Sequence, residues 1–287
     1  MIKSLLAIFI FISTTIFLYS HPGVGIVSDS DGNIYYTDLT HVWKISTDGY
    51  QKIAVKNVHT HELYIDEMDN LYGEHEYYKG EDIDRWSNYV WCLSADGIFE
   101  IVVPEEENLL ENNRLIRDPQ GNSYFAKKDY DHNRIYQETP NGKRLMFSEH
   151  NFQDVRWLHF SKMDNCLYVV DNLKIKKVTP SGEVRIVTRD LIDNQRPFNG
   201  VPDRHYIFGV TTDLEQNVYV AVFGAQKVRK IEKSGRITTV FESEADWSPC
   251  GILIDSKGSK WILEFSKNNQ TRVLRIDKDG DIKTFEN

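Results

Sequence analysis

Cysteine is scarce in this chain of 287 residues, which contains only Cys92, Cys166 and Cys250. So low a count excludes a small domain that depends on disulfides for its stability. The three residues fall in the second, fourth and sixth of the repeats described below, and those repeats would not be neighbours in a ring. Because a disulfide requires Cα atoms within about 7 Å of each other, we expect all three thiols to be free.

Basic residues are also few, with 34 Lys and Arg against 43 Asp and Glu and a net charge of −9. No basic stripe offsets this deficit, which argues against nucleic acid as a partner.

Long uncharged apolar runs are absent except at residues 4–20, which follow Lys3. We interpret residues 1–20 as the signal peptide of a secreted or periplasmic protein, cleaved near Ser20; an uncleaved N-terminal anchor is the alternative. After cleavage we expect no stable membrane span.

Repetition is what this chain has in abundance. Six times a short apolar run leads into a turn related to Asp-x-x-Gly-Asn, and an aromatic strand follows. The anchor positions of these turns lie 37 to 52 residues apart: Asn33, Asn70, Asn122, Cys166, Asn217 and Ser259. A repeat of about 45 residues with four short strands per unit is typical of a β-propeller. Since no helical pattern interrupts residues 21–287, we expect an all-β, six-bladed propeller with four antiparallel strands in each blade.

The repeats place the blades at approximately 22–56, 57–104, 110–150, 153–188, 205–243 and 246–287. The first strand of each is apolar because both of its faces would be buried near the ring axis, whereas the outer strands alternate. The recurrent aspartates at positions 29, 66, 118, 213 and 255 are interpreted as turn residues. If each repeat supplies a whole blade, the ring of a monomer closes by side-chain packing between the first and sixth blades. A blade shared by both termini is the alternative.

The composite pattern Pro-x-Gly-Ile-x-x-Asp-x-x-Gly-Asn-x-Tyr, followed by a basic third strand and a Gly turn, resembles NHL repeats. More broadly, residues 22–287 are similar to the six-bladed superfamily of gluconolactonases, senescence marker protein (regucalcin), paraoxonases and streptogramin lyases. The resemblance implies the propeller and, for several members, a divalent metal. Gluconolactonases would have a Glu where this chain has Gly25 and an Asp where it has Cys250, so their metal site is not reproduced.

Strand direction predicts which residues share a mouth of the ring. First strands begin at the mouth where second strands end. In the second repeat this rule brings the segment His59-Thr60-His61-Glu62 to Glu74-His75. Imidazole and carboxylate suit Zn, Mn or Fe, so we predict His59, His61 and Glu74 as metal ligands, with Glu62 and His75 as catalytic acid or base. Mg and Ca are further options. A hydrogen-bonded network that only seals the channel is the alternative.

Further residues are expected at the same mouth, and two long insertions, residues 76–89 and 189–206, would open there. Long loops in compact domains are often functional. The candidate substrate-binding residues are Asp38, Tyr78, Arg85, Trp86, Arg114, Arg156, Asp171 and Glu264.

These observations lead to two hypotheses about function. In the first, the protein is an exported, metal-assisted hydrolase or lyase of a small lactone, ester or sugar-like compound. In the second, it is a non-catalytic propeller whose rim binds a glycan, a peptide or a protein partner.

Overall fold

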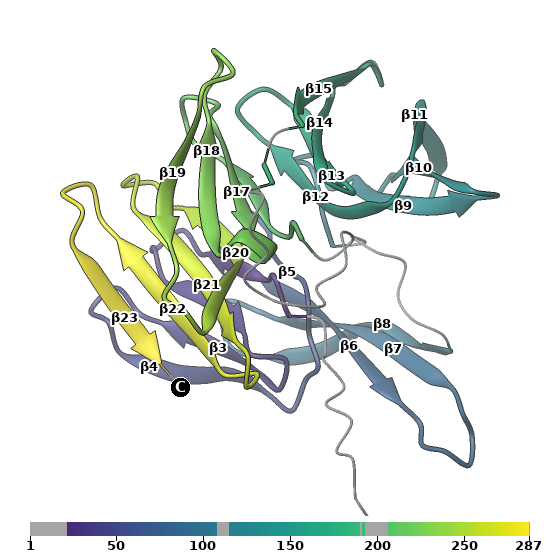
Figure 1. Ribbon diagram of the computed structural model, residues 1–287. Coiled ribbons are helices and arrows are strands. Elements are labelled where there is room, and N and C mark those ends of the chain that lie inside the picture. Colours follow the sequence, from purple (N-terminus) through teal and green to yellow (C-terminus); the bar gives the residue numbers. More distant parts are fainter. Residues whose placement is uncertain (1–21, 108–114, 190, 193–205, 287) are drawn as a thin grey trace, which may run out of the picture.

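Six antiparallel sheets form a six-bladed β-propeller, which confirms the predicted fold class (Figure 1). The structure is a computed structural model that describes residues 22–107, 115–189, 191–192 and 206–286. The predicted signal peptide and Arg114 lie outside this range. Among the described residues, none of the helices is long and apolar enough to cross a membrane.

Each sheet is built from one continuous segment of chain. Blade one contains β1 (Ile26–Ser28), β2 (Ile34–Thr37), β3 (His41–Ile45) and β4 (Gln51–Lys56), and blade two contains β5 (Leu63–Ile65), β6 (Leu71–Tyr78), β7 (Trp86–Leu93) and β8 (Phe99–Glu107). Blade three contains β9 (Ser123–Asp129), β10 (His132–Glu138) and β11 (Arg144–Phe152), and blade four contains β12 (Val155–Ser161), β13 (Cys166–Asp171), β14 (Lys174–Val178) and β15 (Val184–Thr188). Blade five contains β16 (Val210–Thr212), β17 (Val218–Val222), the short helix η2 (Phe223–Ala225), β18 (Lys227–Ile231) and β19 (Ile237–Glu242), and blade six contains β20 (Trp247–Ile254), β21 (Lys260–Ser266), β22 (Thr271–Ile276) and β23 (Ile282–Glu286).

Blade three departs from the four-strand expectation within the described residues. Its sheet has three strands, and the place of the inner strand is taken by an isolated bridge between Arg117 and Ser123. The amide of Tyr124 also donates to the carbonyl of Ile116 at 2.9 Å. The segment before β9 is therefore held against it by single contacts, without a regular ladder.

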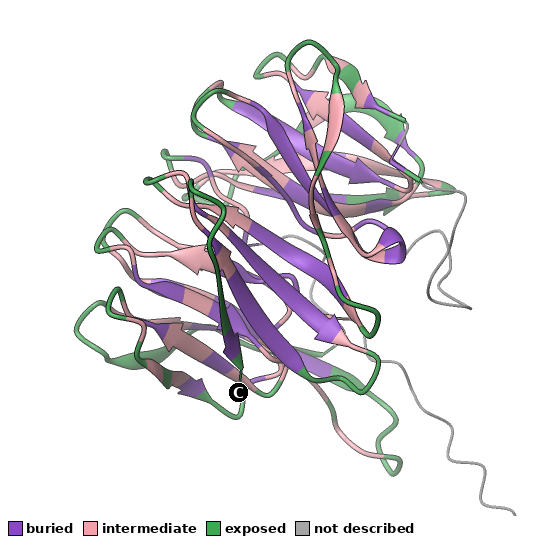
Figure 2. Ribbon diagram, turned by 60° about the vertical axis from the view of Figure 1, so that its left-hand side comes forward, coloured by how far each residue is buried: buried purple, intermediate pink, exposed green. Residues whose placement is uncertain are grey.

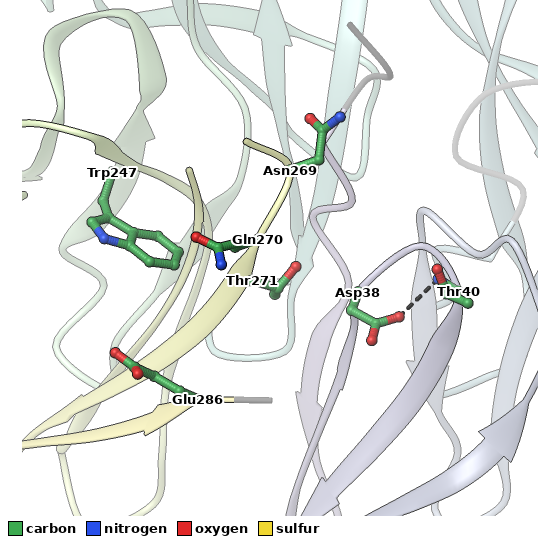
Figure 3. Close-up of a pocket in the computed structure, with 7 residues that line it drawn as sticks. All are labelled: Asp38, Thr40, Trp247, Asn269, Gln270, Thr271 and Glu286. Atoms are coloured by element: carbon green, nitrogen blue, oxygen red, sulfur yellow. Dashed lines mark hydrogen bonds between the residues drawn. The ribbon is translucent and has the colours of Figure 1, made fainter. Parts of the chain in front are cut away.

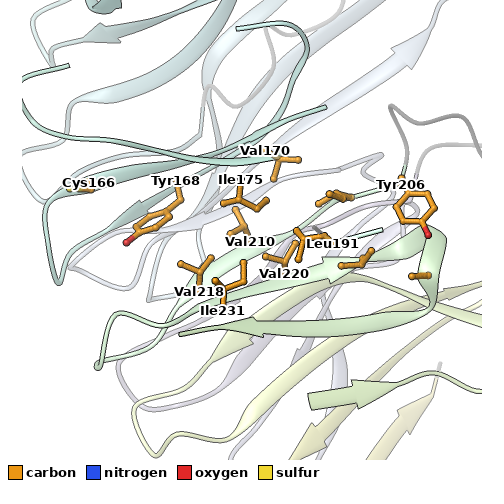
Figure 4. Close-up of a cluster of buried hydrophobic side chains, with 13 residues drawn as sticks. Cys166, Tyr168, Val170, Ile175, Leu191, Tyr206, Val210, Val218, Val220 and Ile231 are labelled. Atoms are coloured by element: carbon orange, nitrogen blue, oxygen red, sulfur yellow. The ribbon is translucent and has the colours of Figure 1, made fainter. Parts of the chain in front are cut away.

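Side-chain packing closes the ring between blades one and six. One apolar cluster joins Ile26 and Tyr36 of blade one to Cys250, Leu263 and Phe265 of blade six. A comparable cluster joins blades four and five, with Tyr168 and Val170 facing Val218 and Val220 (Figure 4). Figure 2 shows that burial follows the sheets, with exposed residues concentrated in turns and outer strands. Cys92, Cys166 and Cys250 are all free thiols, as predicted.

A carboxylate closes the turn after the first strand in most blades. In blade one, Asp29 accepts hydrogen bonds from the Asn33 amide at 2.7 Å, the Asn33 side chain at 2.7 Å and the Tyr35 hydroxyl at 3.2 Å. Blades two, three and five repeat this arrangement. In blade six, Asp255 accepts the backbone amide of Ser259 and the indole of Trp261. The predicted turn role of these aspartates is confirmed.

The insertion at residues 76–89 lengthens the hairpin of β6 and β7, which extends beyond its neighbours (Figure 1). At the base of this hairpin, Gly73 pairs with Trp91, whose side chain is fully buried. A Cβ atom at position 73 would overlap three ring atoms of the indole. Gly73 is therefore required for Trp91 to pack beneath the mouth of blade two.

Gly73→Ala tests this packing. We expect it to lower the free energy of unfolding by about 2 kcal/mol, because the added methyl group forces the indole to move. Urea denaturation of Gly73→Ala, Trp91→Phe and the double variant gives the measurement. The double variant should lose at least ~0.5 kcal/mol less unfolding free energy than the sum of the two single variants, since the smaller ring makes room for the methyl group. Strict additivity would show that Gly73 and Trp91 are not coupled.

Candidate active site at the mouth of blade two

Glu74 joins the two polar segments of blade two. Its carboxylate is almost fully buried and accepts the amide of Glu62 at 3.0 and 3.2 Å, and it also accepts the amide of His61. Its backbone carbonyl accepts the Thr60 hydroxyl at 2.6 Å and the Trp91 indole at 3.1 Å. Glu74, in the middle of β6, thus fixes the segment that leads into β5. The convergence expected from the sequence is present, with Glu74 bound to backbone.

Hydrogen bonds assign the protonated ring nitrogens of two histidines. His59 Nδ1 lies 2.9 Å from the carbonyl oxygen of Leu39, which can only accept, so this nitrogen carries the proton. In neutral His59 the Nε2 lone pair is consequently available. His75 Nδ1 accepts the backbone amide of His59 at 2.7 Å, and the His75 ring lies against Tyr77 and Tyr89. The neutral His75 ring therefore carries its proton on Nε2.

His59 and His61 form a contacting pair, with ring centroids 4.7 Å apart and planes at 86°. Burial lowers the pKa of His59, and the neighbouring His61 lowers it further. Burial also disfavours charged His61, but the hydrogen bond and charge of Glu74, together with the charge of Glu76, outweigh it and raise the pKa of His61. His61 Nδ1 lies 3.5 Å from Glu74 and 3.8 Å from Glu76. The two environments shift the pKa values in opposite directions.

A metal would not fit this donor set as it stands. In the described part of the chain, no three His, Cys, Asp or Glu side chains are arranged to hold a metal ion. Glu74 is engaged with two backbone amides, and His75 Nδ1 with a third. A cation at the predicted ligands His59, His61 and Glu74 would have to displace hydrogen bonds that hold the mouth together.

The candidate substrate residues on the long hairpin are placed together but away from the histidine pair. Tyr78 contacts Trp86 with ring centroids 5.5 Å apart and donates to Asp84 at 2.9 Å. Arg85 pairs with Glu107 at 2.7 Å. Tyr78 follows His75 by three residues on the same strand, so it lies about 10 Å farther along the hairpin.

Acidic residues at the corresponding mouth positions of other blades have partners of their own. Asp38 accepts the amide of Thr40 at 2.7 Å and the indole of Trp43 at 2.7 Å. Asp171 resembles Glu74, because it accepts two amides, from residues 153 and 154, at 2.9 and 2.8 Å. Arg156 binds Asp154 at 2.9 Å, and Glu264 binds Arg272 at 2.7 Å. These side chains therefore form hydrogen bonds and ion pairs that stabilise the mouth of the propeller around them.

The inner strands enclose a central channel of about 260 Å³ to which all six blades contribute residues. Its wall is mostly apolar, with Arg117 over the ring of Tyr64 at 5.9 Å. Burial lowers the pKa of His159 in this wall to about 4, so His159 is neutral at physiological pH.

Sequence reasoning missed two contributors to the site. The carbonyl oxygen of Leu39 orients His59 from the neighbouring blade, and the Thr37 hydroxyl binds the carbonyl of Thr60 at 2.6 Å. Backbone acceptors carry no sequence signal. A polar residue ends the second strand in blades one, three, four and six, at Thr37, Asp129, Asp171 and Ser266, and this recurrence could have indicated Thr37.

Comparison with protein-family models and with curated proteins found no match. Solved structures with this fold include virginiamycin B lyase from Staphylococcus aureus (16% identity, 93% of this chain and 85% of that one, TM-score 0.53). They also include a gluconolactonase from Xanthomonas campestris (13% identity, 89% and 83%, TM-score 0.56). A third is regucalcin from Agrobacterium tumefaciens, described as calcium-binding (13% identity, 90% and 85%, TM-score 0.55). The chain thus shares the six-bladed fold of the group suggested by its repeats.

Glu74→Gln tests the role of the buried carboxylate. We expect the free energy of unfolding to fall by about 2–3 kcal/mol, because two amides lose a charged acceptor. The pKa of His61, followed by NMR, should fall, because Glu74 stabilises its charged form. His150 is the control, since burial and Lys176 lower its pKa without Glu74. An unchanged titration of His61 in the variant would contradict this assignment.

Proposed function

We propose that this protein is a hydrolase or lyase that acts on a small ester, lactone or sugar-like compound with His59 as base and His61 as acid. The observation that carries the proposal is the contact between two imidazoles whose environments shift their pKa values apart. Pairs of titratable groups tuned in opposite directions are typical of acid–base sites. The roles first expected for Glu62 and His75 pass to this pair, because His75 Nδ1 is engaged with backbone and Glu62 is buried.

His59 is suited to accept a proton. Its Nδ1–H donates to Leu39, which fixes the ring and leaves Nε2 as the basic atom. Burial and the adjacent His61 favour the neutral form near pH 7. In hydrolysis, Nε2 would take a proton from the attacking water; in elimination, it would take one from carbon.

His61 is suited to donate a proton. Glu74 and Glu76 favour its imidazolium form, and its side chain is 25% exposed, so a substrate can approach it. The imidazolium would protonate the leaving oxygen while His59 becomes charged, and proton exchange with solvent would restore both rings. No step in this scheme requires a metal.

The structural neighbours give this proposal precedent without assigning the substrate. One neighbour is a catalytically inactive histidine-to-alanine variant of virginiamycin B lyase with quinupristin, at 16% identity and a TM-score of 0.53. Another is a gluconolactonase.

We also propose export of the mature protein, on the composition of residues 1–20. A rim that binds a glycan, peptide or protein without catalysis remains the competing function.

The pH dependence of kcat/KM tests the acid–base pair. Activity requires neutral His59 and charged His61, so it should rise through the lowered pKa of His59 and fall through the raised pKa of His61. The optimum should therefore lie around the ordinary histidine value of about 6.5. Glucono-δ-lactone and 4-nitrophenyl acetate are suitable first probes.

Variants complete this test. His59→Gln and His61→Gln should each lower kcat by roughly 10²–10⁴-fold, and each should remove one limb of the profile. His132→Gln is the matched control, because His132 pairs with Asp131 on the β9–β10 hairpin. Equal activity of all three variants, or an absence of turnover with a wider panel of esters and lactones, would favour the binding propeller.

A further inference from the structure

A second cavity lies at the same mouth of the ring, between blades one and six. It has a volume of about 280 Å³ and is lined by Asp38, Thr40, Trp247, Asn269, Gln270, Thr271 and Glu286 (Figure 3). These residues come from the β2–β3 turn, the start of β20, the β21–β22 turn and the end of β23. The ring has to close before they meet, so the pocket exists only in the folded propeller.

Thr271 gives the strongest indication of a ligand. The residue is only 7% exposed, and its Oγ1 atom is buried without a hydrogen-bond partner. In Figure 3 the hydroxyl points from β22 toward the side where Asp38 and Thr40 lie. Leaving a buried hydroxyl unsatisfied costs roughly 1–3 kcal/mol. A bound molecule with hydroxyl groups of its own would satisfy it.

Trp247 supplies an apolar wall whose orientation is fixed. The guanidinium of Arg272 stacks on the indole at 4.2 Å from the ring centroid. Arg272 is itself held by the buried Glu264 at 2.7 Å and by Glu244 at 3.4 Å. The arginine is therefore already neutralised, and the indole borders the pocket as a rigid surface.

The remaining lining residues carry amides and carboxylates. Asn269 and Gln270 offer both donors and acceptors, whereas Asp38 and Glu286 offer only acceptors when ionised. An aromatic wall beside planar polar side chains suits a compact molecule with an apolar face and many hydroxyl groups. The two carboxylates disfavour an acidic ligand by charge repulsion.

We propose that this pocket binds a neutral sugar. The site is separate from the histidine pair, although the β2–β3 turn touches both: Leu39 binds His59, and its neighbours Asp38 and Thr40 line the pocket. Sugar binding does not depend on the acid–base chemistry proposed above. The two proposals can therefore fail independently.

NMR titration of the full mature protein tests the proposal. Glucose, galactose, mannose and N-acetylglucosamine are added separately, and the indole N–H signal of Trp247 reports on the pocket. At least one sugar should shift this signal saturably, with a Kd on the order of millimolar, whereas glucuronate should bind at least about tenfold more weakly. Absence of a saturable shift with every neutral sugar would overturn the proposal.

Thr271→Val separates ligand binding from folding. It removes a hydroxyl that has no partner in the protein, so the melting temperature should not fall, while sugar affinity should drop at least about tenfold. Gln270→Ala, at an exposed position, should also weaken binding. Thr212→Val is the matched control, since its hydroxyl binds Ser161 at 3.0 Å at the end of a first strand, and it should leave affinity unchanged.

His61→Gln should likewise retain sugar binding. Unchanged affinity in both Thr271→Val and Gln270→Ala would place any observed binding elsewhere and refute the proposed pocket.

Discussion

The carboxylate that closes the first turn of a blade is the interaction on which the rest of this propeller depends. In five blades, one Asp binds both the backbone amide and a side chain downstream, and so fixes the register of the first two strands. Because register is fixed at one end of each hairpin, the residues that reach the opposite mouth are fixed too. The candidate functional residues lie at that opposite mouth, where no Asp-closed turn has to be maintained.

Two acidic residues at this opposite mouth bind backbone amides instead. Glu74 and Asp171 each accept two backbone amides from the segment that leads into the first strand of their own blade. A buried carboxylate engaged in this way is poorly placed to coordinate a metal, but it can still favour a nearby positive charge. The same Glu74 that anchors the strand thereby raises the pKa of His61. Glu74 therefore both stabilises the fold and sets the charge state of His61.

The sequence was sufficient for the fold and for the meeting of the two polar segments, because both follow from the repeat and from strand direction. It was insufficient for the partners within the site. Glu74 binds backbone amides and His59 binds the carbonyl of Leu39, and neither contact depends on a recognisable residue pair. The short inner segment of blade three was also missed. The pocket around Thr271 was beyond prediction, since Asp38 and Thr271 become neighbours only through ring closure.

The protonation states of His59 and His61 test the central claim most directly. Imidazole ¹⁵N NMR of the mature protein at pH 6.5 distinguishes the two neutral tautomers from the imidazolium. The account predicts a mainly neutral His59 with its proton on Nδ1 and a mainly charged His61. Two neutral rings, two charged rings, or a His59 proton on Nε2 would contradict it.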